Sequence, residues 1–397
     1  MSRLEELIAE LCPNGVEYKR LADICNRQKG IAITAGEMKE LDTPSGDIRI
    51  FAAGNTIANV NYEDIPAASV ITIPSVIVKS RGNIGFEYYD KPFTHKNEMW
   101  SYSSKDKNIN IKFVYYFLDN HINEFQVKAK TGKLPQISTP DTDNYKIPVP
   151  PLPVQEEIVR ILDKFTELTA ELATELAKRK PQYQYYRNTL VDFKEGFDRP
   201  SPINGLIAEL CPNGVGYKNL GEVVSFLNGR AYKQQELLSE GKYKILRVGN
   251  FYTNDKWYYS DLELEDDKYC ENGDLLFSWA ASLGAHIWNE GKTIFHYHIW
   301  KLKFDENIIS KKYLYYFLNK DIADIQSSVT KSTMVHVSMG SMGKRKIPVP
   351  PLPIQEEIVR ILDQFEALCN ALASEIEARK KQYEYYRDKL LTFKEAV

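Results

Sequence analysis

Few residue patterns in this chain combine the types and spacing that enzymatic chemistry requires. The segment from Gly340 to Lys344 has the residue types of a phosphate-binding loop but not its spacing. Residues 140–143 begin like the paired acids of a nuclease, but Tyr145 stands where that pattern needs a lysine. No Asn-Pro-Pro-Tyr or Asp-Pro-Pro-Tyr pocket of an aminomethyltransferase occurs, and spacing singles out no set of Ser, His and Asp. We therefore expect no catalytic residues in this chain.

One histidine pair has the spacing of metal ligands. His296-Tyr-His298 would present both imidazoles on the same face of a strand. However, no cysteine or carboxylate stands at a matching spacing, and comparison within the chain sets Phe93-Thr-His95 opposite this pair. We expect the pair to be structural or to face a ligand, with no bound metal.

Positive charge is concentrated in two parts of the chain, although the formal net charge is −3. Residues 79–133 hold ten Lys or Arg against six acidic residues, and residues 331–346 hold four basic residues and no acid. Lys and Arg beside Ser, Thr, Asn and Gly suit phosphate contacts, while Asn, Gln, Arg and Ser suit base edges. Each cluster alone could be ordinary solvated surface, but their matching places before one proline-rich joint favour nucleic acid. The candidate DNA-contacting residues are Lys79, Arg81, Asn83, Lys96, Asn97, Lys128, Lys130, Lys133, Arg230, Lys233, Arg247, Asn250, Ser278, Ser282, His296, His298, Lys331, Ser332, Lys344 and Arg345.

Two stretches of the chain recur about 200 residues further on. Residues 8–21 return as residues 207–220, and residues 146–163 return as residues 346–363 with the single change of Val154 to Ile354. The Tyr-Tyr-Phe-Leu of residues 115–118 returns at 315–318. Chance does not produce such repetition, so the chain is an internal duplication. These matching stretches are termed the shared frame.

The stretches between, residues 26–110 and 225–310, are only distantly alike and are termed the variable middles. Trp100 falls opposite Trp300, and Gln136-Ile-Ser138 falls opposite His336-Val-Ser338. We therefore expect one fold with two different surfaces. This pattern is typical of a frame that meets two copies of one partner while each middle meets its own ligand. Drift of loops is the alternative.

Short β-runs and helices should build each repeat. Residues 2–11 have the pattern of an amphipathic helix, and further helices are expected near 111–124 and 311–325. The middles hold short apolar runs bounded by Gly, Asn or Pro, at 70–73, 75–78, 244–248 and 274–278. Four prolines within residues 148–153 favour a stiff joint over a ligand for an SH3-type domain.

From Val154 and Ile354 onward, apolar residues recur at heptad spacing for five heptads. Each helix of about forty residues would be roughly 60 Å long. The two could pair antiparallel within the chain; a purely structural coiled coil is the alternative. Arg179 and Arg379 fall on the seam, where a charge needs a partner, and Pro181 should bend or break the first helix. The seam residues, which are also the expected docking surface, are Ile158, Leu162, Phe165, Leu172, Leu176, Tyr183, Tyr186, Leu190, Ile358, Leu362, Phe365, Leu372, Ile376, Tyr383, Tyr386 and Leu390.

The composition is that of a globular protein. A chain of 397 residues is too long for one compact core and suits two domains. The five cysteines are scattered, without a Cys-x-x-Cys pair, and are expected to be reduced thiols. No apolar run of eighteen residues and no secretory signal is present, so we expect a cytoplasmic protein without membrane contact.

The shared frame resembles the DNA-specificity subunits of Type I restriction–modification systems. The resemblance covers the whole chain and is most specific in residues 147–162, their copy at 347–362, and the opening Leu-Cys-Pro-Asn-Gly-Val. It implies an α+β fold in which two mixed α/β target-recognition domains are separated by two long helices. These helices would form an intramolecular antiparallel coiled coil with a pseudo-two-fold axis. The implied domains are residues 1–150 and 198–350, and the implied helical regions are 151–197 and 351–397.

The resemblance also implies partners. Each target-recognition domain would read one half of a split, asymmetric sequence in double-stranded DNA, while the helices set the spacer and dock two methyltransferase subunits. Those partners would bind S-adenosylmethionine and methylate adenine N6, and a restriction and translocase subunit would use ATP and Mg²⁺. This chain would hold no cofactor. The alternatives are a recognition subunit of a different methyltransferase or phage-defence complex, a scaffold that binds only protein, and an enzyme in its own right.

Overall fold

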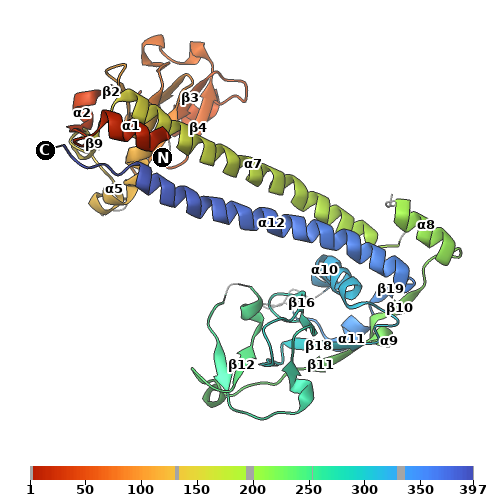
Figure 1. Cartoon of the computed structure of the whole chain (residues 1–397). Helices are drawn as coiled ribbons and strands as arrows, with labels where there is room; N and C mark the ends of the chain where they lie inside the picture. Colours follow the sequence, from red (N-terminus) through yellow and green to blue (C-terminus); the bar gives the residue numbers. More distant parts are fainter. Residues whose placement is uncertain (1–2, 130–133, 194–200, 253, 329–335, 397) are drawn as a thin grey trace. The chain divides into compact units, whose positions relative to one another are not determined.

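The computed structural model describes residues 3–129, 134–193, 201–252, 254–328 and 336–396, and it divides into two compact units (Figure 1). The first unit comprises Met1–Ala173 and Ser374–Val397, and the second comprises Thr174–Ala373. The boundary cuts both long helices, so each unit holds one domain of strands and short helices, the start of one long helix and the end of the other. The domain of strands and short helices keeps the name recognition domain from the expectation above. The fold is α+β, and the order of elements is repeated.

In the first unit, short strands and helices precede the long helix α7 (Leu152–Leu190). The helices are α1 (Arg3–Leu11), α2 (Leu21–Ile24), α3 (Ala35–Leu41), η1 (Tyr62–Asp64), η2 (Ala67–Ser69), α4 (Ile111–Asn120), α5 (Ile122–Lys128) and α6 (Thr139–Asp143). The strands are β1 (Tyr18–Arg20), β2 (Cys25–Lys29), β3 (Ile48–Phe51), β4 (Ile57–Val60), β5 (Ser75–Lys79), β6 (Gly85–Tyr89), β7 (Phe93–His95), β8 (Trp100–Ser104) and β9 (Lys146–Pro148).

Three small sheets make up the recognition domain of the first unit. The strand orders are β2-β8-β5-β6, β4-β3-β7 and β1-β9, and β3 with β7 is the parallel pair among them. Helix α4 begins where Asn110 caps the backbone N–H groups of Lys112 and Phe113. Its Phe113 and Phe117 are buried against the first of these sheets, together with Val76 and Val78 of β5. The helix expected near 111–124 therefore packs apolar residues against the sheet.

The second unit repeats these elements before the long helix α12 (Leu352–Leu390). The helices are α8 (Ser201–Leu210), α9 (Leu220–Val223), η3 (Gln234–Glu236), η4 (Val248–Phe251), η5 (Asp266–Lys268), α10 (Lys311–Ser328) and α11 (Met339–Gly343). The strands are β10 (Tyr217–Asn219), β11 (Val224–Asn228), β12 (Tyr243–Leu246), β13 (Tyr258–Ser260), β14 (Tyr269–Cys270), β15 (Leu275–Ser278), β16 (Gly284–Ile287), β17 (Thr293–Phe295), β18 (Ile299–Phe304) and β19 (Lys346–Pro348).

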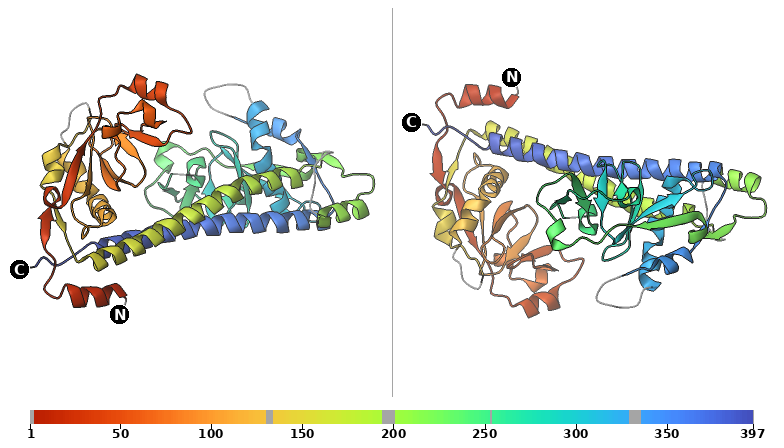
Figure 2. Two further views of the ribbon diagram at one scale, coloured as in Figure 1. Left: turned by 90° about the horizontal axis from the view of Figure 1, so that it is seen from above. Right: turned by 90° about the horizontal axis from the view of Figure 1, so that it is seen from below.

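Apart from one added strand, the sheets of the second unit have the same strand order as those of the first. Figure 2 shows both units from two further sides. Their orders are β11-β18-β15-β16, β13-β12-β17-β14 and β10-β19, with β12 and β17 parallel. Strand β14 is the one addition among the described residues, and it occupies the place of an isolated bridge between Ile71 and Phe93 in the first unit. The β-run predicted at 70–73 is therefore wrong, because that bridge is its only ladder contact in the described residues. One fold with two surfaces is confirmed.

The two long helices pair antiparallel within each unit. In the first unit the ring of Phe165 on α7 stacks on Tyr386 of α12, with centroids 5.6 Å apart. In the second unit Tyr186 on α7 stacks on Phe365 of α12 at 4.9 Å. Of the predicted seam, Ile158, Leu162, Leu190, Ile358, Leu362 and Ile376 are buried; Phe165, Leu172, Leu176, Tyr183, Tyr186, Phe365, Leu372, Tyr383 and Leu390 are half-buried; and Tyr386 is 37% exposed.

A buried glutamine clamps the proline-rich joint of each unit. Gln155 Nε2 donates to the carbonyls of Pro150 at 2.7 Å and Asn108 at 3.0 Å, and its Oε1 accepts from the backbone N–H of Asn110 at 2.9 Å. Gln355 makes the matching three bonds in the second unit. The helices begin at residues 152 and 352, one residue after the starts implied for the helical regions and two before the heptad pattern. A proline fits the first turn of each, because no backbone N–H is needed there.

The predictions for the two seam arginines and for Pro181 have different outcomes. Arg179 pairs with Glu175 at 2.6 Å and Arg379 pairs with Glu375 at 2.7 Å, so both seam arginines have the partner that they need. Pro181 was predicted to bend or break the first helix, and the break is wrong because α7 continues through Pro181. Pro181 is exposed, and water can therefore hydrate the carbonyl that loses its N–H partner.

Helix ends and cysteines complete the comparison with the sequence. Both long helices end at residues 190 and 390, before the ends expected for the helical regions. The first of the helices expected after the middles is divided at His121 into α4 and α5, whereas α10 is continuous. All five cysteines are free thiols. In the described parts of the chain, no helix has the length and apolarity that crossing a membrane requires.

Candidate nucleic-acid interface

In the first unit, three segments meet at one edge of the recognition domain. The turn after β5 is held to the segment before α6, because Ile137 N–H donates to Ser80 O at 3.0 Å and Gly82 N–H donates to Pro135 O at 2.9 Å. The turn between β7 and β8 lies beside them, since Ser80 Oγ donates to the carbonyl of Glu98. We term the exposed side chains of these segments the first turn surface.

The second unit builds the equivalent edge with the same backbone bonds. Val337 N–H donates to Trp279 O at 3.1 Å, and Trp279 N–H donates to His298 O at 3.1 Å. The turn between β17 and β18 is fixed by a bond from Tyr297 N–H to Arg230 O at 3.1 Å, as Asn97 N–H bonds Ile31 O in the first unit. The exposed side chains here are termed the second turn surface.

These matching bonds establish which residues occupy equivalent places. His296 N–H bonds Leu246 O and Lys96 N–H bonds Phe51 O, both at 2.9 Å. The pair opposite His296-Tyr-His298 is therefore Lys96-Asn97-Glu98, which corrects the comparison with Phe93–His95 by three residues. At equivalent places the two units present Ser80 and Trp279, Lys96 and His296, Asn97 and Tyr297, Glu98 and His298, and Gln136 and His336.

Six predicted contact residues lie on or near the first turn surface. Arg81, Asn83 and Asn97 are exposed at the two turns. Lys79 and Lys96 are half-buried and already paired, with Glu87 at 2.7 Å and Glu98 at 3.5 Å respectively. Lys128 is exposed at the end of α5, with its ammonium 5.6 Å from the ring centroid of Tyr145. The structure thus brings together side chains from residues 79–83 and 96–97.

In the second unit, His296, His298, Arg247, Arg230 and Ser282 lie around the second turn surface. Burial lowers the pKa of His296 to about 4 and also lowers that of His298, with Arg247 adding to both shifts. The guanidinium of Arg230 forms two bonds to Glu236, at 2.8 and 2.9 Å. Both histidines are therefore uncharged near pH 7, and one of the two nearby arginines is already paired.

Other predicted contact residues serve the domain itself or lie away from the turn surfaces. Ser278 is fully buried and donates to the carbonyl of Ser282 at 2.7 Å, while Asn250 bonds the backbone of its own loop. Arg345 pairs with Asp321 on α10. Contact of these three with DNA gains no support from their positions. Lys233 and Lys344 are exposed on separate loops. Lys130, Lys133, Lys331 and Ser332 lie outside the described residues.

The family model of the Type I restriction modification DNA specificity domain matches the chain twice, over residues 13–179 and 212–380. These ranges include each recognition domain with the helix that follows it. This chain belongs to that family.

Relatives of known assignment agree with the family match. A Haemophilus influenzae protein assigned as a type I restriction enzyme specificity subunit is 30% identical and aligns over 95% of this chain and 96% of its own length. The EcoR124I/EcoR124II specificity subunit of Escherichia coli is 30% identical over 73% of each chain. The crystal structure of a Type I S subunit from M. genitalium has the same fold, with a TM-score of 0.65, 19% identity and 95% and 96% of the two chains covered.

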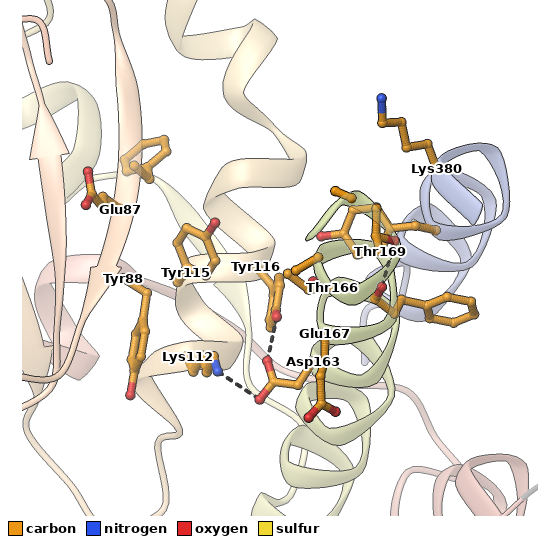
Figure 3. Close-up of a pocket in the computed structure, with 15 residues that line it drawn as sticks. Glu87, Tyr88, Lys112, Tyr115, Tyr116, Asp163, Thr166, Glu167, Thr169 and Lys380 are labelled. Atoms are coloured by element: carbon orange, nitrogen blue, oxygen red, sulfur yellow. Dashed lines mark hydrogen bonds and ion pairs between the residues drawn. The ribbon is translucent and has the colours of Figure 1, made fainter. Parts of the chain in front are cut away.

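The specificity-domain repeat includes a fixed link between each recognition domain and the long helices. In the first unit this link borders a cavity of about 1000 Å³ (Figure 3). Asp163 of α7 accepts bonds from Tyr116 Oη at 2.5 Å and Lys112 Nζ at 2.8 Å, both on α4. The second unit repeats this link: Tyr316 and Lys312 bond Asp363 at 2.6 and 2.7 Å. In each unit an aspartate and a tyrosine of the shared frame, together with a nearby lysine, therefore orient the recognition domain on its helices.

Sequence reasoning about this family member missed four side chains of the turn surfaces: Gln136, Trp279, Tyr297 and His336. A signal for two of these residues was present in the sequence, since the internal alignment sets Gln136 opposite His336. The alignment does not show the isolated β-bridges that place Gln136 beside Arg81 and His336 beside Ala280. Among the residues that the structure describes, no group of three potential ligands could hold a metal ion.

Proposed function

We propose that this chain is the DNA-reading subunit of a Type I restriction–modification complex and that it recognises a bipartite, asymmetric target. One observation carries the proposal: the same backbone edge occurs once in each unit and presents different side chains. Two equal edges with unequal side chains are what a reader of two different half-sites needs. Membership of the DNA-specificity family supports DNA as the ligand.

Recognition would divide between phosphate and base contacts. Exposed cations at the rim, such as Arg81, Lys128 and Arg247, would bind phosphates and position each domain without reading sequence. Side chains at the turns, such as Asn97 in the first unit, would reach base edges in a groove. The long helices would then fix how many base pairs separate the two half-sites.

The shared frame would dock copies of one partner. Its residues recur almost unchanged in both units, whereas the middles differ, as expected where one protein surface is bound twice. The Escherichia coli relative is named as the specificity subunit of a restriction enzyme, which supports methyltransferase and restriction subunits as partners. In this proposal the chain is non-catalytic, two methyltransferase subunits bind S-adenosylmethionine, and the restriction subunit uses ATP and Mg²⁺.

The test combines a domain exchange with mapping of methylated adenines. The chain and its methyltransferase would be expressed together, and methylation-aware sequencing would give the target. Replacing residues 26–145 with the corresponding residues of another family member should change one half of that target and leave the other half as it was. A change in both halves, or in neither, would contradict the two-reader proposal.

The second candidate is a scaffold that binds only protein, which the continuous apolar seam on α7 and α12 would suit. The two candidates differ in their response to salt. Phosphate contacts release counterions, so the affinity of a DNA reader falls steeply between low and moderate salt. Binding of the purified complex to a DNA duplex across a salt series would decide, and absence of salt-dependent DNA binding would leave the scaffold as the better account.

A further inference from the structure

Four side chains of the second turn surface form one aromatic cluster. Trp279 lies 5.1 Å from the ring of His298 and 5.7 Å from that of His336, measured between centroids. The ring of Tyr297 lies 3.9 Å from that of His298. Tyr297 and His336 are exposed, and Tyr297 retains 38% of its accessible surface. The cluster thus comes from the turn after β15, the turn before β18 and the segment before α11.

A hydrogen bond and a stacking contact hold Trp279 of the cluster in place. Trp279 Nε1 donates to Tyr297 O at 2.8 Å, which ties the two turns together through a side chain. The indole of Trp279 also stacks on that of Trp300, with centroids 5.6 Å apart and 17° between the planes. Trp300 is buried within the domain. The indole of Trp279 therefore loses little conformational freedom when a ligand binds, so less of its contact free energy is offset by ordering.

One imidazole of the cluster, that of His298, is uncharged near neutral pH. Burial, the neighbouring imidazole of His336 and Arg247 all lower the pKa of His298. A neutral imidazole offers one N–H donor and one acceptor nitrogen. The equivalent places in the first unit hold Ser80, Asn97, Glu98 and Gln136, which are a hydroxyl, two amides and one carboxylate. The two turn surfaces thus differ in chemistry as well as in sequence.

We propose that the second recognition domain discriminates bases through this aromatic cluster of Trp279, Tyr297, His298 and His336. The inference rests on the proposed function and adds which residues read the second half-site. The rings of Trp279 and Tyr297 contribute little to phosphate binding, which depends on cations. The cluster suits base edges, where imidazole nitrogens match donors and acceptors and ring carbons contact the thymine methyl group. Its role is therefore in sequence preference, whereas general affinity comes from the cations at the rim.

The test uses the assembled methyltransferase complex with Tyr297→Ala or His336→Ala. Asn97→Ala, at the place equivalent to Tyr297 in the first unit, is the matched control. Competition between the cognate duplex and duplexes altered in one half would measure preference. We expect each second-unit variant to lower the preference for the cognate second half roughly tenfold or more. Preference in the first half and affinity for unrelated DNA should stay at the original values, while Asn97→Ala should affect the first half alone.

Two outcomes would overturn the assignment. One is unchanged preference in both Tyr297→Ala and His336→Ala. The other is an equal loss of affinity for all duplexes, which would make the cluster a phosphate or packing site. Tyr297→Phe keeps the ring and removes only the hydroxyl, so this variant should retain the preference wherever the hydroxyl makes no contact. If the Tyr297→Phe variant lost its folding or all DNA binding, that result would also count against the assignment. If the original complex shows no sequence-dependent DNA binding, the proposed function itself fails.

Discussion

Replacement of Gln155 by methionine should destabilise the first unit by loosening its proline-rich joint. The Gln155 side chain is 1% exposed and makes three hydrogen bonds, to Pro150, Asn108 and Asn110. Methionine has nearly the same length, so it fills the same space and removes only the hydrogen-bonding atoms. The variant would leave one N–H and two carbonyls without their partner.

The size of the effect follows from the number of bonds. A buried hydrogen bond contributes about 1 kcal/mol net, and an orphaned buried group costs somewhat more. Three lost bonds should therefore lower the free energy of unfolding of the first unit by about 3 kcal/mol. Since Gln355 makes the same three bonds in the second unit, Gln355→Met should cost the second unit a similar amount.

Hydrogen exchange followed by mass spectrometry would measure the loss in each unit separately. In Gln155→Met the loss of protection should fall on peptides of residues 18–29, 100–128 and 146–165, while Gln355→Met should affect their counterparts. Gln184→Met, at an exposed position of α7, controls for the change of residue type. A loss under about 1 kcal/mol in the first unit, the least that one lost bond predicts, would refute the clamp.

Two further predictions concern charge. His95 is fully buried, and its pKa is lowered to about 4 in the folded protein. In the unfolded chain the same histidine has its ordinary pKa of about 6.5, so below this pH the unfolded state binds more protons than the folded state. Stability should fall by about 3 kcal/mol as pH drops from 6.5 to 4; urea unfolding across this range would show it, and an equally steep loss in His95→Gln would assign it elsewhere. Lys128→Ala should weaken DNA binding for every sequence and lower the salt slope by about 1; a change in the sequence read would contradict its role as a phosphate contact.

Local and periodic features of the fold could be predicted from the sequence. The heptads from residue 154, the prolines of the joint and the repeat itself each depend on residues close in sequence or on direct identity. The division of the predicted helix at His121 could not be predicted from the sequence, because no Gly or Pro stands at that position. The run at 70–73 was mistaken for a strand because apolarity alone does not show whether a ladder partner exists.

The turn surfaces could be predicted only in part. Arg81, Asn97 and His298 were found because their residue types suit DNA, whereas Trp279 and Tyr297 have types that ordinary cores also use. What distinguishes these two is position, which depends on strand register between segments about twenty residues apart. Likewise, burial of Ser278 follows from its place in β15 and not from its polar side chain. Residue type therefore indicated the ligand, while register decided which side chains can reach it.

The turn after β15 shows that the surrounding sheet determines the backbone of the turn surface. Gly82 has φ of +78° in the first unit, and Ala281, which occupies the equivalent place, has φ of +64°. Alanine in this left-handed region costs roughly 1–2 kcal/mol. The second unit nevertheless keeps the turn, because backbone bonds to His298 and Val337 hold Trp279 at its start. A domain built in this way can exchange the side chains that face a ligand while their places in space stay constant, which is what two readers on one frame require.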